Sequence, residues 1–173
     1  MDVFEAIKGR RSVRAFKPTP LKEADLQKIL EAAIASPSAG NRQPWEFVVV
    51  KDQETKQKLV QAARGQSFIA DAPVVVVVCT NAERSASRYG DRGATLYCIQ
   101  DTAAAVQNIH LAAYALGYAT CWIGAFDEAA AAKVIRAPAG VRPVAMIPIG
   151  KANEAPSAPS RIPLEKVVHK DSF

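Results

Sequence analysis

The chain has 173 residues, of which 49% are hydrophobic and 23% charged, values typical of a single soluble domain (residues 1–173) with a sizeable core. Its longest apolar run, residues 72–79, contains a proline and is far shorter than the roughly 20 residues of a membrane-spanning helix, so no membrane partner is expected. The net charge of +5 comes from scattered Lys and Arg residues without a zinc-finger, RRM or KH signature, which argues against nucleic acid and fits a small anionic ligand.

The first predicted element is a short helix over residues 3–8, which Asp2 caps and Gly9 ends. A strongly basic segment follows directly and consists of Arg10, Arg11, Ser12, Val13 and Arg14. Guanidinium groups keep their charge at any working pH and can bind two phosphate oxygens at once. Because three of them repel one another at this spacing, the segment favours an anionic ligand between them. A basic helix end in solvent is the alternative.

An extended connector over residues 16–20 leads into an amphipathic helix over residues 22–35. Residues 36–45 contain two prolines, one glycine and several small polar side chains, which predicts a loop. Its amide and hydroxyl groups can line a polar heterocycle, and a solvated turn is the alternative interpretation.

Two uninterrupted apolar runs predict strands over residues 46–50 and 72–79, each buried on both faces. A helix is expected between them over residues 54–63. Residues 81–93 are polar and contain three arginines, so we expect a mobile segment on the surface there. Whether this segment is a lid stays open.

The longest helix is predicted over residues 95–116, where apolar residues recur at helical spacing and Gly117 marks the end. Its apolar face is so extensive that we expect a central position and a contact with a second subunit as well. His110 lies within the apolar stripe, which favours a hydrogen-bonded core or interface histidine over a catalytic one.

The last third of the chain predicts strands over residues 119–126 and 142–149, and the first of them runs into a turn of small residues. A helix that Asp127 caps lies between them and continues to Ile135. The tail is rich in proline and serine up to residue 163, and an extended segment is expected over residues 164–169.

Three cysteines at wide spacing, Cys79, Cys98 and Cys121, and only two histidines argue against a zinc site and against a disulfide framework. We therefore expect reduced, packed thiols and no metal ion. The N-terminal residues lack the basic start and the apolar centre of a signal peptide, so a cytoplasmic location is expected.

The motifs of serine hydrolases, zinc proteases, Rossmann proteins and P-loop proteins do not occur in the sequence. The remaining candidates are the basic segment, the amide-rich loop, a Trp-Ile-Gly-Ala turn and two late cations, Lys151 and Arg161. These groups suit a phosphorylated planar ligand but supply no obvious acid, base or nucleophile. A redox cofactor would resolve this mismatch, because the cofactor itself then carries the chemistry.

Three segments in this order and spacing resemble the signature segments of the nitroreductase family, which are FMN-dependent NAD(P)H oxidoreductases: residues 10–14, 37–45 and 122–126. The resemblance extends over almost the whole chain, as far as residues 159–164. It implies a three-layer α+β fold in which a central mixed, mainly antiparallel sheet is flanked by helices. It also implies an intertwined homodimer with two FMN molecules at the subunit interface.

The resemblance also implies the FMN contacts. Arg14 and the backbone N–H at Gly124 would lie beside the isoalloxazine, and no further catalytic group is implied. The other cofactor-binding residues implied on the same subunit are Arg10, Arg11, Ser12, Trp122, Ile123, Ala125, Gly150, Lys151 and Arg161. Those implied to come from the partner subunit are Pro37, Ser38, Ala39, Asn41 and Gln43.

The implied reaction is hydride transfer from NAD(P)H through flavin N5 to an electron-poor acceptor such as a nitroaromatic, a quinone or free flavin, with ping-pong kinetics. Arg14 would stabilise the negative charge that reduction places on N1 and the O2 carbonyl. A protein that stores or senses FMN with little turnover is the alternative, with the same site residues. The chain is shorter than many family members, so the acceptor and the choice between NADH and NADPH stay open.

Overall fold

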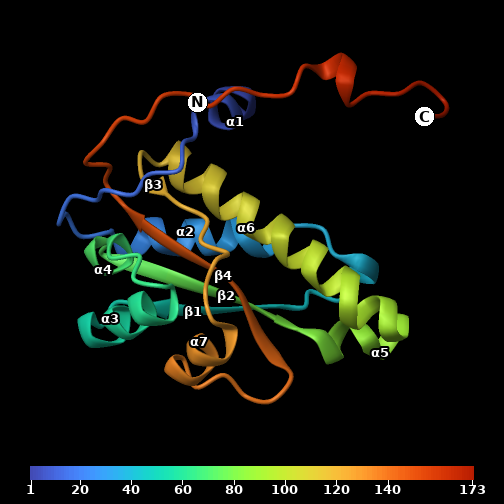
Figure 1. The fold of residues 1–173 in the computed structure, drawn as a ribbon, viewed down its shortest axis with the longest axis horizontal. Helices are drawn as coiled ribbons and strands as arrows, with labels where there is room; N and C mark the ends of the chain where they lie inside the picture. The colour runs from blue at the N-terminus through green and yellow to red at the C-terminus, as the bar shows by residue number, and fades with distance from the viewer.

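The computed structural model describes all residues, 1–173, and places helices on both faces of one four-stranded sheet (Figure 1). The strands are β1 (Trp45–Val50), β2 (Val74–Asn81), β3 (Ala119–Thr120) and β4 (Val141–Gly150), in the spatial order β1-β2-β4-β3. All the ladders are antiparallel, and the only parallel pairing is a single bridge between Ser12 and Thr120. The predicted α+β class with a mainly antiparallel sheet is confirmed.

Strand β2 forms the centre of the sheet because its run of β-branched residues fits a strand covered on both faces. Val76 lies opposite Val49 of β1 and opposite Ile147 of β4. Strand β1 is instead an edge strand, and Val49 stays 37% exposed. Phe47 and Val48 pack against the core clusters on opposite faces of the sheet, so the prediction that residues 46–50 are buried on both faces is confirmed in part and is wrong for Val49. The apolar run indicated a strand but contained no information on its number of neighbours.

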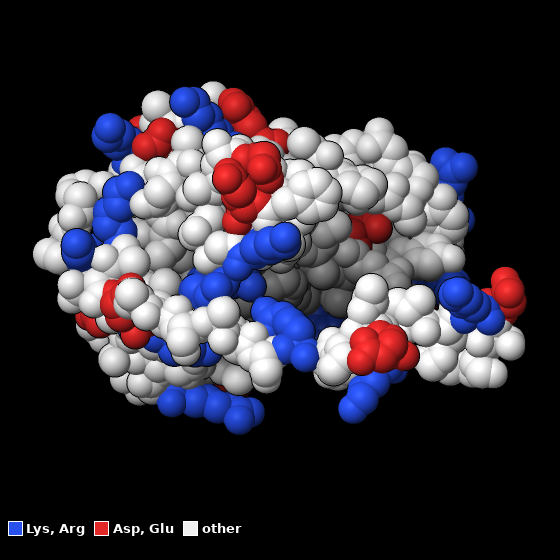
Figure 2. Space-filling view, turned by 90° about the horizontal axis from the view of Figure 1, so that it is seen from above, with Lys and Arg blue, Asp and Glu red and all other residues white.

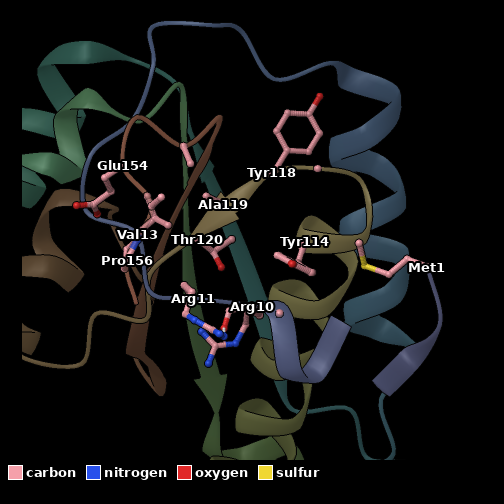
Figure 3. A pocket seen from close by; sticks show the side chains of 14 residues that line it. Met1, Arg10, Arg11, Val13, Tyr114, Tyr118, Ala119, Thr120, Glu154 and Pro156 are labelled. Atoms are coloured by element: carbon pink, nitrogen blue, oxygen red, sulfur yellow. Dashed lines mark hydrogen bonds between the residues drawn. The ribbon is translucent and has the colours of Figure 1, made fainter. Parts of the chain in front are cut away.

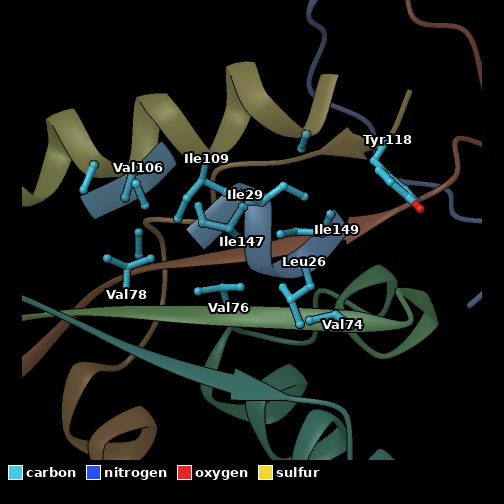
Figure 4. Packing of buried hydrophobic residues seen from close by; sticks show 14 of the residues in the cluster. Leu26, Ile29, Val74, Val76, Val78, Val106, Ile109, Tyr118, Ile147 and Ile149 are labelled. Carbon is cyan, nitrogen blue, oxygen red and sulfur yellow. The ribbon is translucent and has the colours of Figure 1, made fainter. Parts of the chain in front are cut away.

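Helices α2 (Glu23–Ile34) and α6 (Cys98–Ala115) cover one face of the sheet. Their apolar stripes bring Ile29 and Ile109 against the side chains of Val76 and Ile147 (Figure 4). The prediction that the longest helix is central is confirmed. The opposite face is covered by α3 (Gln53–Ala62), α4 (Phe68–Asp71) and α7 (Glu128–Val134). The three layers are therefore helices, sheet and helices, as the family resemblance implies.

The first helix, α1 (Val3–Gly9), lies outside these layers and packs on the C-terminal part of α6, where Gly9 contacts Tyr114. Asp2 caps it through the backbone N–H of Glu5, at 2.9 Å, and the carboxylate of Glu5 accepts from the N–H of Asp2 in return. The predicted boundaries of this helix are confirmed to within one residue.

The polar segment before α6 is a helix, α5 (Ala82–Arg92), followed by a π-helical turn (Gly93–Tyr97). The sequence predicted a mobile surface segment over residues 81–93 and did not predict this helix. The Asn81 side chain accepts the N–H of Arg84 at 3.1 Å and so begins the helix, and Arg84 is paired with Glu46. Gly90, with φ +54° and ψ −141°, breaks the helical geometry near the end. Arg84, Arg88 and Arg92 recur every four residues after the Asn81 cap, and this polar periodicity is the sequence signal of the helix.

The substitution Gly93→Ala is expected to lower the free energy of unfolding by about 1–3 kcal/mol. Gly93 has helical backbone angles, φ −64° and ψ −47°, so the cause is purely steric. An added Cβ would lie 2.6 Å from the carbonyl oxygen of Ser85 and 3.0 Å from the nitrogen of Ala86, and these backbone atoms cannot rotate away. Urea unfolding measures the change. The control Gly124→Ala, whose Cβ meets nothing closer than 3.8 Å, should keep its stability; an equal loss in both variants would contradict this reason.

The chain after α6 contains less strand than predicted. Only Ala119 and Thr120 belong to a ladder, and Ile123 then forms a two-hydrogen-bond bridge with Met146, both bonds at 3.0 Å. The tail leaves the sheet after β4 and runs past α1 (Figure 1). Residues 157–173 are exposed, and Leu164–Lys166 forms a 3-10 turn in place of the expected extended segment. None of the helices is both long enough and apolar enough to cross a bilayer.

Candidate functional site

The basic segment after α1 lies between two other parts of the chain. On one side, the N–H of Val13 donates to the carbonyl of Thr120 at 3.0 Å. On the other side, the N–H of Lys17 donates to the carbonyl of Lys151 at 2.8 Å, and a carboxylate oxygen of Glu154 accepts the N–H of Arg14. These bonds place the basic segment beside the turn that follows β3.

The arginines of this segment differ in how their guanidinium groups are used. Arg11 donates to the carbonyls of Lys8, at 2.6 Å, and of Arg10, at 2.9 Å, and so caps the C-terminus of α1. Neither Arg10 nor Arg14 has a carboxylate within 4.0 Å of its guanidinium, because the four ion pairs of the protein involve other residues. Arg10 and Arg14 are therefore the cations left to bind an anionic ligand.

A cavity of about 480 Å³ opens beside this segment, between α1, the C-terminal end of α6 and the start of the tail. In Figure 3 the side chains of Arg10 and Arg11 lie together on one wall, and the rings of Tyr114 and Tyr118 lie on another. Lys and Arg side chains gather along one side of a hollow on this face of the molecule (Figure 2). A phosphate next to a planar group suits such walls, since guanidinium forks bind phosphate oxygens and aromatic rings contact flat molecules.

The buried thiol of Cys121 shows how closely the basic segment approaches the turn. Burial raises the pKa of Cys121, and the nearby charges of Arg14 and Arg10 act in the opposite direction, as does a hydrogen bond with the side chain of Ser12. The negative charge of Glu154 raises the same pKa. Arg10, Ser12 and Arg14 therefore all lie close enough to Cys121 to affect the pKa of its thiol. All three cysteines are free and buried, as predicted.

His110 is a buried, neutral support of this region. Its Nδ1 lies 2.6 Å from the hydroxyl oxygen of Thr120, and its ring stacks on Trp122 with the centroids 5.8 Å apart. Burial, together with the charge of Arg10, lowers the pKa of His110 to about 4. The prediction of a hydrogen-bonded core histidine is confirmed, and the imidazole holds Trp122 in place near neutral pH.

The turn over residues 122–125 has backbone N–H groups that no atom of the chain accepts. Ile123 is buried and fixed by its bridge to Met146, whereas Trp122 is 42% exposed. Gly124 and Ala125 are exposed, and their backbone N–H groups donate no hydrogen bond within the chain. These two donors are available to an acceptor atom of a ligand.

The loop over residues 37–43 is tightly folded. Gly40, Asn41 and Gln43 all have left-handed backbone angles, with φ of +52°, +55° and +49°. The hydroxyl of Ser38 accepts the N–H of Gln43 at 3.0 Å, and the side-chain amide of Gln43 donates to the Asn41 side chain at 3.1 Å. The loop is therefore ordered by its own hydrogen bonds, while Pro37, Gly40, Asn41 and Gln43 are exposed to solvent.

Three residues outside this loop hold it through hydrogen bonds and are not among the predicted site residues: Asp101, Arg84 and Ser87. The carboxylate of Asp101 in α6 accepts the N–H of Ala39 at 3.1 Å. The guanidinium of Arg42 donates to the carbonyl of Arg84, at 3.0 Å, and to the hydroxyl of Ser87, at 2.6 Å. Asp101 is only 8% exposed, its second oxygen has no partner, and burial raises its pKa. An acidic residue on the buried face of an apolar helix is the sequence signal that could have singled out Asp101, although its partner in the loop is visible only in the structure.

The substitution Asp101→Ala is expected to loosen the loop and to weaken any ligand that the loop contacts by about tenfold, because the N–H of Ala39 loses its acceptor. Asp101→Asn keeps an acceptor oxygen and should restore most of the lost affinity. Hydrogen exchange at residues 38–43 measures the loosening, and titration with FMN measures the affinity. If both variants behave alike, the bond to Ala39 has no such role.

The basic segment and the loop lie at opposite ends of α6. Asp101, which binds the loop, is in the first turn of this helix, and Tyr114, which contacts Gly9, is in the last. Tyr114 follows Asp101 by thirteen positions, which corresponds to about 20 Å along the helix axis at 1.5 Å per residue. Within one chain, the two sets of predicted ligand-binding residues therefore do not meet.

Three further predicted site residues have other surroundings. Gly150 is buried, and a Cβ there would lie 2.7 Å from Pro73 and 3.1 Å from Phe16. The ammonium of Lys151 donates to the carbonyl of Gly117 at 2.8 Å and lies 3.9 Å from the ring centroid of Tyr118. Arg161 lies in the exposed tail and bonds only to the carbonyls of Pro159 and Ser160.

Comparison with known proteins assigns this arrangement to a family. The profile of the nitroreductase family matches residues 7–68 and 62–151. An NADH dehydrogenase of Thermus thermophilus is 31% identical over 195 residues, which cover 97% of this chain and 95% of that protein. An FMN reductase of Bacillus subtilis is 26% identical over 185 residues, with coverage of 99% and 74%.

The solved structure of the NADPH:FMN oxidoreductase of Vibrio harveyi in complex with NAD+ superimposes with a TM-score of 0.91 at 26% identity. It covers 99% of this chain and 77% of that one. The residues that the family profile matches include the basic segment, the loop and the turn described above. The chain belongs to the nitroreductase family.

Proposed function

We propose that the protein is an FMN-dependent NAD(P)H oxidoreductase that reduces an electron-poor small molecule: a nitroaromatic, a quinone or free flavin. The observation that carries the proposal is the convergence of two arginines without carboxylate partners, Arg10 and Arg14, beside a turn whose Gly124 N–H has no acceptor. Family membership and relatives named as an FMN reductase and an NADPH-flavin oxidoreductase support FMN as cofactor and NAD(P)H as donor.

The residues of the site fit FMN group by group. Arg10 would bind the phosphate, Ser12 a ribityl hydroxyl, and Arg14 the pyrimidine edge, where its charge stabilises the reduced form. The free N–H of Gly124 would face N5. When bound, FMN supplies the hydride chemistry, so the protein needs only to bind, orient and shield the reactants. Donor and acceptor would use the same place in turn, which gives ping-pong kinetics.

The site would be completed by a second copy of the chain. The loop over residues 37–43 contacts the first turn of α6 and the basic segment follows the helix that contacts its last turn, about 20 Å away along the helix axis, so the two form separate surfaces of one chain. Large apolar side chains are exposed on α1, on the turn and on the tail: Val3, Phe4, Ile7, Trp122, Leu164, Val167 and Val168. Burying such residues favours association. We therefore propose a homodimer in which the loop of each copy completes the site of the other.

An absorption spectrum of the purified protein, recorded before and after anaerobic addition of NADH or NADPH, tests this function. The expected result is a bound flavin whose visible absorption is bleached by the donor and restored by a quinone or a nitroaromatic compound. A colourless protein that also fails to take up added FMN contradicts the proposal. Bound flavin that neither donor reduces favours a protein that stores or senses FMN.

A further inference from the structure

The exposed side of α5 and the following turn holds a cluster of two arginines and two tyrosines. The guanidinium carbon of Arg88 lies 5.5 Å from the ring centroid of Tyr89, and that of Arg92 lies 5.2 Å from the ring centroid of Tyr97. The two rings meet edge to face, with centroids 5.2 Å apart and an interplanar angle of 81°. We call these four residues the arginine–tyrosine cluster.

The cluster lies directly against the loop over residues 37–43. Gly40 of the loop contacts the hydroxyl of Tyr89, and its Cβ position lies 3.2 Å from the Arg88 side chain. The bonds of Arg42 to Arg84 and Ser87 fix the loop to the same helix. In the proposed dimer this loop borders the FMN, so the arginine–tyrosine cluster would border the entrance for the substrate.

Arg88 differs from the other arginines around this loop because its guanidinium has no hydrogen-bond acceptor and no carboxylate partner, and lies only over the ring of Tyr89. Arg84 donates to the carbonyl of Gln43 at 2.7 Å and pairs with Glu46, and Arg92 donates to the hydroxyl of Tyr97 at 2.9 Å. Arg88 makes no hydrogen bond and no ion pair in the chain, and its side chain is exposed. The nearby acidic residues, Glu83 and Asp91, do not pair with it. A structural role in holding the loop therefore does not account for Arg88.

We propose that the arginine–tyrosine cluster is a specificity site for substrates that combine a planar ring with a carboxylate or phosphate group, an inference that rests on the proposed function. A guanidinium above an aromatic ring is weakly hydrated and can bind two oxygens of such a group. The tyrosine rings contact the flat part of the ligand. The anionic group belongs either to the acceptor or to the dinucleotide donor, and both present the same chemistry to Arg88.

The test compares two acceptors of nearly equal size, 4-nitrobenzoate and 4-nitrobenzamide, in the FMN-loaded enzyme. The wild type is expected to prefer the anion in kcat/KM, and Arg88→Gln should lower this preference about three- to tenfold, the effect of losing one charged hydrogen-bonding partner. Arg88→Lys keeps the charge without the fork and should restore part of the preference. Higher ionic strength should weaken the preference in the wild type.

The matched control is Arg64→Gln, which removes one exposed charge at the end of α3, on the other side of the sheet. It should leave the preference unchanged. The KM values for NADPH and NADH distinguish the two possible sources of the anionic group. If Arg88→Gln raises these KM values and leaves kcat/KM for 4-nitrobenzoate unchanged, the anionic group belongs to the dinucleotide. An equal preference in Arg88→Gln, Arg64→Gln and wild type, together with unchanged KM values for NADPH and NADH in Arg88→Gln, overturns the proposal.

A binding measurement separates this proposal from the proposed function. Calorimetric titration of the protein as purified with benzoate and with benzamide requires no turnover. Tighter binding of benzoate that Arg88→Gln abolishes supports the cluster even when NAD(P)H is not oxidised. Equal binding of benzoate and benzamide by an enzyme that does oxidise NAD(P)H, with the same KM for NADPH and NADH in Arg88→Gln as in the wild type, overturns the cluster and leaves the proposed function intact.

Discussion

Replacing both Arg10 and Arg14 by alanine is expected to abolish retention of FMN while the chain still folds. Neither guanidinium is in an ion pair, so its loss breaks no contact with a carboxylate of the protein. Each charged hydrogen bond contributes about 1.5–3 kcal/mol, so losing two should raise the dissociation constant of FMN by about a hundredfold or more. The flavin content after gel filtration measures retention, and quenching of flavin fluorescence by the apoprotein measures affinity.

A matched control removes two positive charges elsewhere. Lys28 in α2 and Lys133 in α7 are exposed and make no ion pair, so the variant Lys28→Ala/Lys133→Ala has the same net charge as the test variant. It should keep its flavin, and circular dichroism should show both variants folded. Full flavin content in the Arg10→Ala/Arg14→Ala variant would mean that the phosphate lies elsewhere.

Lowering the pH from about 6.5 to about 4 is expected to lower the free energy of unfolding by about 3 kcal/mol through His110 alone. The unfolded chain protonates this imidazole near its ordinary pKa of 6.5, whereas the folded chain, with a pKa of about 4, does not. Protons therefore bind preferentially to the unfolded state, and the free energy of unfolding falls as the pH is lowered from about 6.5 to about 4. Above pH 6.5 both states are neutral at this residue, so its contribution is constant.

Urea unfolding of the wild type and of His110→Gln at several pH values between 7 and 4 measures this contribution. Glutamine keeps a polar group near Thr120 but cannot titrate, so the variant should lose less stability on acidification. Carboxylates with lowered pKa, such as Glu128 bonded to Arg142, act alike in both proteins and cancel in the comparison. Equal pH dependence in both proteins would show that His110 is not the responsible group.

Hydrophobic periodicity was enough to predict the elements that form the core. The stripe of α6, the amphipathic α2 and the valine run of β2 all depend on burial, which leaves a regular pattern along the sequence. The helix α5 has no apolar stripe and is held by the cap of Asn81 on Arg84 and by the pairing of Arg84 with Glu46. The pairing with Glu46 leaves no local pattern, whereas the cap and the spacing of Arg84, Arg88 and Arg92 do, and a prediction from apolar stripes alone misses them.

Only part of the candidate site could be predicted from the sequence, because some of its residues are joined by contacts between distant parts of the chain. Arg10, Ser12 and Arg14 lie close together in the chain, and the structure brings them to Cys121 at the turn. The support of the loop by Asp101 joins residues 62 positions apart, and only the packing of α6 reveals it. The assignment of Lys151 and Arg161 to a phosphate was drawn from the family alone, and the ammonium of Lys151 already binds the carbonyl of Gly117.

The position of Asp101 and Tyr114 at the two ends of α6 has a consequence for changes in chain length. Adding one residue within this helix would shift everything beyond it by 1.5 Å and rotate it by about 100°. In the proposed dimer, such an insertion would misalign both halves of both sites at once. Insertions in the exposed tail or between α7 and β4 would move neither half. The length of α6 would thus set the distance between the two FMN sites of the dimer.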